Sequence, residues 1–300
     1  MPQSLLMCSP DYFAVKYTIN PWMAGKIGKV DHPLATKQWV DFFSTLKKLT
    51  AVKLLTPQPH VPDLVFTANA GLIYGNKFVL SRFRHQERRP EEPYFRDWFQ
   101  YSGYEVVEWQ RLIHFEGAGD ALFQPGRNLL WASHGFRTDA ETHSLLAKNF
   151  AVRVISLRLI DPRFYHLDTC FCPLLDDKVM YYPKAFDAES LKWIEEYTLP
   201  QNRIAVADED ALHFACNAVL VDRNIILNAV SDDLGRRLEA AGYTVIVNPV
   251  SEFLKAGGAN KCLTLQLTEQ AQNDGGELKT GENRQTAEPR NLPANPAIAI

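Results

Sequence analysis

Five polar or reactive side chains stand at nearly constant spacing along the chain, each directly before a short, mainly apolar run. They are Asn69, Asp120, Asp168, Asn217 and Cys262. Successive intervals are 51, 48, 49 and 45 residues. A repeat of this length is typical of a fold built from radially arranged units. If the five runs are equivalent strands, their polar ends converge near one axis, where an active site can be assembled.

Cys262 is the candidate nucleophile. It lies in KAGGANKCLTL, where glycines permit close approach of the backbone before a strand begins. A thiol at the mouth of a strand, following a lysine and a loop of amides, has the setting of a reactive cysteine. The alternative is a buried structural cysteine, which is the commoner role of this residue.

The segment YHLDTCFCP carries a candidate acid/base pair, His166 and Asp168. Residues two apart on an extended segment share a face, so both side chains can meet one ligand. The alternative is a structural histidine–carboxylate hydrogen bond. Cys170 and Cys172, taken with His166, raise the question of zinc, but one C-x-C without a second cysteine pair argues against it. We therefore expect two core thiols and no metal site.

Four further residues have the chemistry to hold a substrate. Glu116 stands before a Gly-x-Gly turn in FEGAGD, and Asp63 lies in PDLVFTANAG. Arg88 and Arg137 lie beyond the strand pairs, where a guanidinium can hold a carboxylate in a forked contact. The alternative for each arginine is a solvated surface charge.

The elements that position these residues repeat as strand, strand, helix, strand. Each apolar run is interrupted by a polar turn, and apolar residues recur at helical spacing in the stretch that follows. The predicted helices span residues 91–103, 139–150, 188–198 and 232–243. The strands predicted after them span residues 104–109, 152–159, 203–207 and 244–250.

The fifth unit is split between the ends of the chain. CLTLQL supplies one strand, and residues 4–9, 34–49 and 51–57 supply a strand, a helix and a strand. Pairing the last strand with the first would close a ring and remove open sheet edges. We predict an α/β fold, a closed five-bladed ββαβ propeller with pseudo-five-fold symmetry, as a single catalytic domain over residues 1–268. The alternative is an open doubly wound α/β sheet.

Composition narrows the classes of protein. The chain has 300 residues, a net charge of −3 and 46% hydrophobic residues, which favours neither nucleic-acid binding nor a membrane span. The N-terminus lacks signal-peptide features. Five cysteines without a disulfide framework favour reduced thiols and a cytoplasmic protein. Residues 269–300 hold no aromatic residue and many amides, so we expect a disordered tail. A homo-oligomer is compatible with the sequence.

The combination of PDLVFTAN, FEGAGD, SHGFRTD, HLDTCFCPL and GGANKCLTL resembles the guanidine-modifying enzymes. These include arginine deiminase, dimethylarginine dimethylaminohydrolase and the amidinotransferases. The opening MCSPDYFAVKYTINPWM looks most like the arginine dihydrolase branch. The resemblance covers nearly all of residues 1–268, and it implies the same five-fold α/β propeller.

The resemblance also implies roles for individual residues. Cys262 resembles the nucleophile and His166 the general acid/base. Glu116, which completes the predicted catalytic group, and Asp168 are similar to the carboxylates that hold the guanidinium.

Further positions match substrate-binding residues of these enzymes. Arg88 and Arg137 resemble the arginines that clamp the α-carboxylate. Asn20, in TINPWM, matches a substrate-contacting asparagine, and Asp63 matches the first acid of the P-D-x-V-F motif. Asn69 departs from deiminases and dimethylaminohydrolases, which have an aspartate there, and agrees with the dihydrolase branch.

The resemblance therefore implies an arginine dihydrolase, which converts L-arginine to L-ornithine, two ammonia and carbon dioxide through a covalent cysteine intermediate, without a cofactor. Asparagine supports this outcome because its amide can also hydrogen-bond a neutral ureido group. The alternatives are a deiminase or dimethylarginine dimethylaminohydrolase that releases citrulline, and an amidinotransferase. Two further alternatives depart more from this activity. One is a non-catalytic propeller that acts as a binding module, and the other is a degenerate enzyme that lacks its partner domain.

Overall fold

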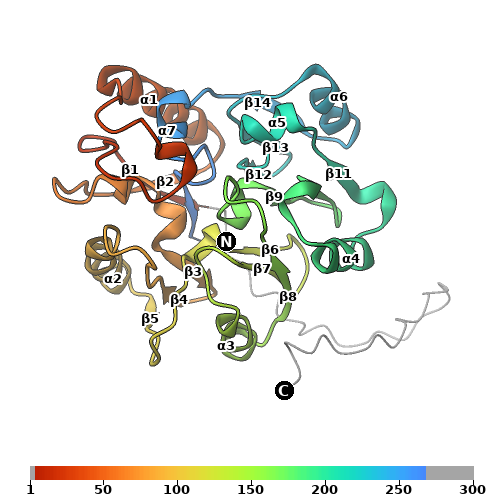
Figure 1. The fold of residues 1–300 in the computed structure, drawn as a ribbon, viewed down its shortest axis with the longest axis horizontal. Helices are drawn as coiled ribbons and strands as arrows, with labels where there is room; N and C mark the ends of the chain where they lie inside the picture. The colour runs from red at the N-terminus through yellow and green to blue at the C-terminus, as the bar shows by residue number, and fades with distance from the viewer. Residues whose placement is uncertain (1–3, 268–300) are drawn as a thin grey trace.

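The computed structural model describes residues 4–267, which form five three-stranded sheets. In each sheet the middle strand pairs antiparallel with one neighbour and parallel with the other. The sheets lie around a common centre, with the longer helices at the periphery (Figure 1). This arrangement confirms the predicted α/β class and its five repeated units.

The strands are given for each sheet in the order antiparallel, middle and parallel. They are β15 (Leu265–Gln266), β1 (Ser4–Cys8) and β2 (Ala51–Leu55); β3 (Gly71–Tyr74), β4 (Lys77–Leu80) and β5 (Glu105–Val107); β6 (Ala121–Phe123), β7 (Leu129–His134) and β8 (Arg153–Arg158); β9 (Phe171–Pro173), β10 (Val179–Tyr181) and β11 (Arg203–Ala205); and β12 (Val219–Val221), β13 (Asn224–Leu227) and β14 (Thr244–Val247).

One amphipathic helix links the middle strand of each sheet to its parallel neighbour. These helices are α1 (His32–Leu49), α2 (Glu92–Tyr101), α3 (Glu141–Phe150), α4 (Ala188–Tyr197) and α6 (Asp232–Ala240). Two short helices that the sequence pattern did not indicate are α5 (Asp208–Leu212) and α7 (Ser251–Leu254). The five longer helices agree with their predicted ranges to within a few residues.

The helices begin where a polar side chain can cap them and pack where apolar residues recur. Asp31, Asp187 and Ser231 accept hydrogen bonds from backbone N–H groups in the first turns of α1, α4 and α6. In α2, Phe95 and Phe99 face inward and are fully buried. The helices thus cover the outer parts of the sheets with one apolar face each.

The unit predicted to be split between the chain ends is joined as expected. Leu6 of β1 pairs with Leu265 of β15, antiparallel, while β1 and β2 run parallel. The first and last strands of the described chain therefore share one sheet. The predicted tail, residues 269–300, lies outside the described residues.

Tight turns, rather than strand ends proper, carry the repeated polar residues. Short 3-10 turns at Thr67–Ala70, Gly117–Gly119 and Leu167–Thr169 lead into β3, β6 and β9. Gly117 has φ +63°, and a Cβ there would lie 2.7 Å from the backbone nitrogen of Gly71. These turns therefore pack against each other with almost no space between them.

The described residues contain no candidate membrane-spanning helix and no candidate metal-binding cluster. Between residues 4 and 267, no helix combines the length and apolar character needed to cross a membrane. Within the same range, no group of three or more His, Cys, Asp or Glu side chains is placed to hold a metal ion.

Candidate active site

Seven of the nine site residues predicted from the sequence line one small cavity of about 10 Å³. They are Asn20, Asp63, Asn69, Arg88, Arg137, His166 and Cys262. The other two, Glu116 and Asp168, contact His166 and Cys262 directly. Residues that lie up to about 240 positions apart in the chain thus meet at one place.

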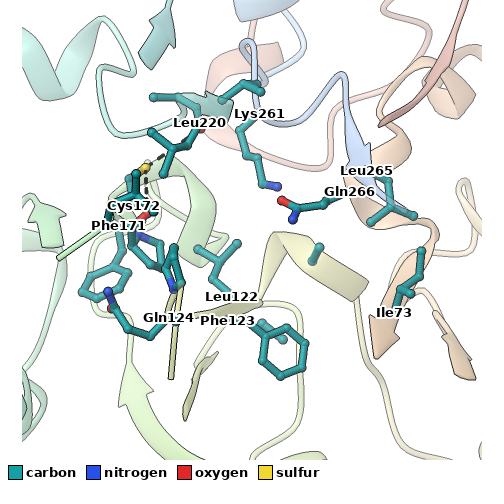
Figure 2. Close-up of a pocket in the computed structure, with 18 of the residues that line it drawn as sticks. Ile73, Leu122, Phe123, Gln124, Phe171, Cys172, Leu220, Lys261, Leu265 and Gln266 are labelled. Atoms are coloured by element: carbon teal, nitrogen blue, oxygen red, sulfur yellow. Dashed lines mark hydrogen bonds between the residues drawn. The ribbon is translucent and has the colours of Figure 1, made fainter. Parts of the chain in front are cut away.

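A far larger cavity, of about 710 Å³, lies elsewhere and contains none of the nine. The strands β3, β6, β9, β12 and β15 line it, and the side chain of Lys261 projects into it (Figure 2). Its size alone would favour it as a ligand site. The convergent titratable groups are around the small cavity, and we assign the candidate active site there.

Cys262 lies between α7 and β15, with its side chain buried. Its thiol donates to Asp168 Oδ2 at 3.3 Å and receives a hydrogen bond from Asn217 Nδ2 at 3.1 Å. Burial, and then the negative charge of Asp168, raise the pKa of the Cys262 thiol well above its usual value. With no ligand bound, the sulfur is therefore a protonated thiol rather than a thiolate.

His166 belongs to a buried charge cluster. Its Nε2 donates to Glu116 Oε2 at 2.7 Å, and Arg137 Nη1 donates to the same oxygen at 3.0 Å. Burial alone would raise the pKa of Glu116, but Arg137 and His166 outweigh it and hold that pKa below its usual value. An ionised Glu116 thus accepts a charge-assisted hydrogen bond from Arg137 and also orients the ring of His166.

Two buried carboxylate oxygens find no hydrogen-bond partner among the described residues: Oδ1 of Asp168 and Oδ1 of Asp63. The second oxygen of Asp63 accepts from the Tyr17 hydroxyl at 2.8 Å. Burial raises the pKa of Asp168 to about 6, opposed by His166 and by the thiol of Cys262. Because unpaired buried oxygens are unfavourable, both positions are suited to N–H donors of a cationic ligand.

Asn69 is held in one orientation by Arg88. The guanidinium of Arg88 donates from Nε and Nη2 to the two carboxylate oxygens of Glu91, both at 2.8 Å. Its Nη1 donates to Asn69 Oδ1 at 2.8 Å. Asn69 Nδ2 donates to the backbone oxygen of Glu116 at 3.3 Å. Arginine has only donors, so the Asn69 oxygen must face it. The amide therefore keeps one N–H that makes no hydrogen bond among the described residues.

The predicted substrate contact Asn20 has both ends of its amide engaged by the protein. Its Oδ1 accepts from the N–H groups of Trp22 and Met23, and its Nδ2 donates to the backbone oxygen of Ala256 at 2.9 Å. Arg137 Nη2 also donates to the backbone oxygen of Ile19. Hydrogen bonds made by Asn20 and Arg137 therefore hold the loop around Ile19 and Asn20 against the cavity.

Sequence reasoning gave no role to several residues that the structure brings into the site. Asn217 donates a hydrogen bond to the sulfur of Cys262. Asp120 accepts hydrogen bonds from the hydroxyls of Ser133 and Thr138 and from the N–H of Leu167, which follows His166. Both belong to the repeated set, which was the signal that could have identified them.

Glu91 and Tyr165 were also missed. Glu91 is the buried partner of Arg88, and the ring of Tyr165 lies 4.5 Å from the Arg137 guanidinium carbon. Glu91 lies in RRPEEP, whose charges suggest an exposed surface, so no sequence signal marked it as buried.

Comparison with known proteins identifies the family. The family model described as "N,N dimethylarginine dimethylhydrolase, eukaryotic" matches residues 18–269. The chain belongs to this dimethylarginine dimethylhydrolase family. The match confirms the resemblance to guanidine-modifying enzymes on which the residue roles were predicted.

Relatives within the family are similar over most of this chain. Bifunctional arginine dihydrolase/ornithine cyclodeaminase AgrE of Nostoc sp. is 52% identical over 269 residues, 90% of this chain and 38% of that protein. ArgZ of Synechocystis sp. is 52% identical over 88% of this chain and 38% of its own length. The chain thus spans 38% of these two relatives. The N(G),N(G)-dimethylarginine dimethylaminohydrolase of Mycobacterium tuberculosis is 38% identical over 87% of this chain and 84% of its own length.

A solved structure of this family has the same fold. The crystal structure of the N-terminal domain of ArgZ, an arginine dihydrolase from the ornithine–ammonia cycle in cyanobacteria, was solved as a cysteine-to-serine mutant bound to substrate. It is 51% identical, covers 89% of this chain and 98% of that domain, and has a TM-score of 0.88.

The electrostatics of the thiol give a direct test. Asp168→Asn removes the negative charge that raises the pKa of Cys262, so the pH of half-maximal alkylation should move down. At neutral pH the reaction of Cys262 with iodoacetamide should become about tenfold faster, which corresponds to a fall of about one unit in the pKa of the thiol. Peptide mass spectrometry of timed samples follows this one cysteine. An unchanged or slower reaction in a folded variant contradicts the assigned influence of Asp168.

Proposed function

We propose that this protein is an arginine dihydrolase that converts L-arginine to L-ornithine, two ammonia and carbon dioxide. The observation that carries the proposal is the placement of a buried thiol, Cys262, against a buried carboxylate, Asp168, that has one unpaired oxygen. A guanidinium is the ligand that satisfies both the charge and the planar hydrogen-bond geometry of such a carboxylate. The similarity to AgrE and ArgZ supports arginine as its source.

Binding of the guanidinium would activate the nucleophile. The positive charge would neutralise Asp168, removing the group that keeps the Cys262 proton on sulfur. It would also lie beside the sulfur and favour the thiolate directly. The proton would pass to His166, which is hydrogen-bonded to Glu116. The reactive form is thus made only when substrate is present.

The other end of arginine would meet the remaining polar groups. Asp63 Oδ1, buried and unpaired, is suited to the α-ammonium group. Arg137 and Arg88 remain the proposed contacts of the α-carboxylate. Arg137 makes two side-chain hydrogen bonds and Arg88 makes four, so Arg137 has more N–H groups to offer. Asn20 would act here chiefly by holding the N-terminal loop over the ligand.

The chemistry then takes two hydrolytic rounds. In the first, the thiolate forms a bond to the guanidino carbon, and ammonia leaves with a proton from His166. Water, deprotonated by His166, attacks the adduct; the C–S bond breaks and bound citrulline remains. In the second, the thiolate attacks the ureido carbon and a second ammonia leaves. Water releases a carbamate, which loses carbon dioxide to give ornithine. No step in this scheme calls on a metal or an organic cofactor.

Asn69 would decide whether the second round occurs. Its oxygen accepts from Arg88 and its NH₂ donates to the backbone oxygen of Glu116, so one N–H is unused among the described residues. That N–H can donate to the ureido oxygen of citrulline. An aspartate would offer only acceptors, and a buried carboxylate facing a neutral group would be uncompensated at a cost of several kcal/mol. Neutral Asn69 therefore retains the intermediate.

We also propose the broader features that frame this activity. The five units would form a closed ring with pseudo-five-fold symmetry, because β15 joins the sheet of β1 and β2. Residues 1–268 would be one catalytic domain. All five cysteines are free and buried, which supports a reducing compartment such as the cytoplasm.

Product analysis tests the reaction. Incubation with arginine should give ornithine with two ammonia per molecule and no lasting citrulline, measured by amino-acid analysis and an ammonia assay. Citrulline with one ammonia would show a deiminase instead. Citrulline from dimethylated arginine, with arginine left intact, would show a dimethylaminohydrolase, and transfer to an added amine would show an amidinotransferase.

Asn69→Asp should convert the products from ornithine to citrulline. The side chains are nearly isosteric, and the aspartate can still accept from Arg88, so arginine should still be attacked. Citrulline should become the major product, with a fall of about tenfold or more in ornithine formation, because losing one discriminating hydrogen bond changes a rate by roughly that factor. Equal ornithine formation by the folded variant would show that Asn69 is not the determinant.

A further inference from the structure

Asn217 is the member of the repeated set that contacts the nucleophile and yet has no part in the reaction steps above. Its side chain is fully buried in the turn before β12. Asn217 Oδ1 accepts from the backbone N–H groups of Ala259 and Cys262, both at 3.1 Å. Nδ2 donates to the backbone oxygen of Asp168 at 3.0 Å and to Cys262 Sγ at 3.1 Å. One amide thus joins the nucleophile loop to the turn that carries Asp168.

The chemistry of its partners fixes the orientation of this amide. Two backbone N–H groups converge on one end, so that end must be the oxygen. A backbone carbonyl faces the other end, so that end must be the NH₂ group. Rotating the amide by half a turn would break all four of these hydrogen bonds. The sulfur of Cys262 therefore always faces a donor.

Lys261, which directly precedes the nucleophile in the sequence, does not supply this contact. Its side chain instead projects into the 710 Å³ cavity (Figure 2). Neighbouring residues thus project to different cavities. Lys261 lowers the pKa of Asp168 through its charge, but the hydrogen bond to sulfur comes from Asn217.

We propose that Asn217 is the positioning residue of the nucleophile, which holds the loop at Ala259–Cys262 and donates a hydrogen bond to the thiolate form of Cys262. This inference rests on the proposed role of Cys262 as nucleophile, and goes beyond it by naming the group that supports the ionised sulfur.

The two partners of the sulfur have opposite effects. Asp168 accepts the thiol proton and stabilises the neutral form, whereas Asn217 can only donate and stabilises the anion. A hydrogen bond to an ionised acceptor is about twice as strong as one to a neutral acceptor. When a guanidinium occupies Asp168, the opposing influence is removed and the Asn217 bond remains. The amide thus helps make ionisation of Cys262 respond to substrate.

The test compares Asn217→Ser with Asn228→Ser. Asn228 is a buried asparagine after β13 that also bridges two backbone segments, through the oxygen of His213 and the N–H of Val250, and it does not contact Cys262. It controls for the loss of a buried structural amide. Iodoacetamide alkylation of Cys262 is followed against pH by peptide mass spectrometry, a readout that needs no substrate and is thus independent of whether arginine is processed.

Asn217→Ser should move the pH of half-maximal alkylation up by about one unit, with roughly a tenfold slower reaction at neutral pH. Its kcat for arginine should fall while KM changes little. Asn228→Ser should keep the wild-type pH profile. A folded Asn217→Ser variant with the wild-type profile would overturn the proposal, as would an equal shift in both variants.

A measurement on the unmodified protein covers the case in which Asn217→Ser does not fold. The side-chain NH₂ resonance of Asn217, observed by ¹⁵N NMR, should shift as Cys262 ionises, with the same midpoint as alkylation. A resonance that stays constant while the thiol titrates would overturn the proposal without any substitution.

Discussion

Arg88 and Arg137 bring two positive charges into a site where almost no water reaches them, with 4% and 3% of their surfaces exposed. Each is matched by a buried glutamate, Glu91 for Arg88 and Glu116 for Arg137. An isolated buried charge would cost several kcal/mol, so the arrangement is stable only as pairs. Beside these pairs, Asp168 has one buried oxygen with no hydrogen-bond partner among the described residues. A cationic ligand placed there would balance the charge of this carboxylate.

This requirement explains why the site is made of turns rather than of strand residues. Charges can be matched only if side chains from distant units approach within hydrogen-bond distance. The turns before β3, β6 and β9 lie against each other, and the turn before β12 is tied through Asn217 to the loop of Cys262. The helices and sheets surround these turns and hold them in place (Figure 1).

The repeat and the apolar patterns were enough to predict five sheets, the helix of each unit and the pairing of the first and last strands. Of the nine predicted site residues, three are at the repeat positions, and the other six came from local motifs and from the resemblance to guanidine-modifying enzymes. Hydrogen-bond allocation could not be read from the sequence. Glu91 looks like a surface charge until its buried ion pair with Arg88 is seen, and the cap that Asn20 forms on its own turn could not be read from TINPWM. Both pairings are local in sequence, but their burial depends on packing against distant residues such as Ala256 and Asn69, which spacing alone does not encode.

The most direct test of this account is the covalent bond itself. Protein quenched with acid during turnover of arginine labelled with ¹³C at the guanidino carbon should carry a labelled amidino group, and the peptide that contains Cys262 should hold all of it. The Cys262→Ser variant, treated in the same way, should carry none. Turnover to ornithine with no labelled Cys262 peptide, or with the label on another residue, would contradict the assignment of this thiol, and with it the role given to the charges around it.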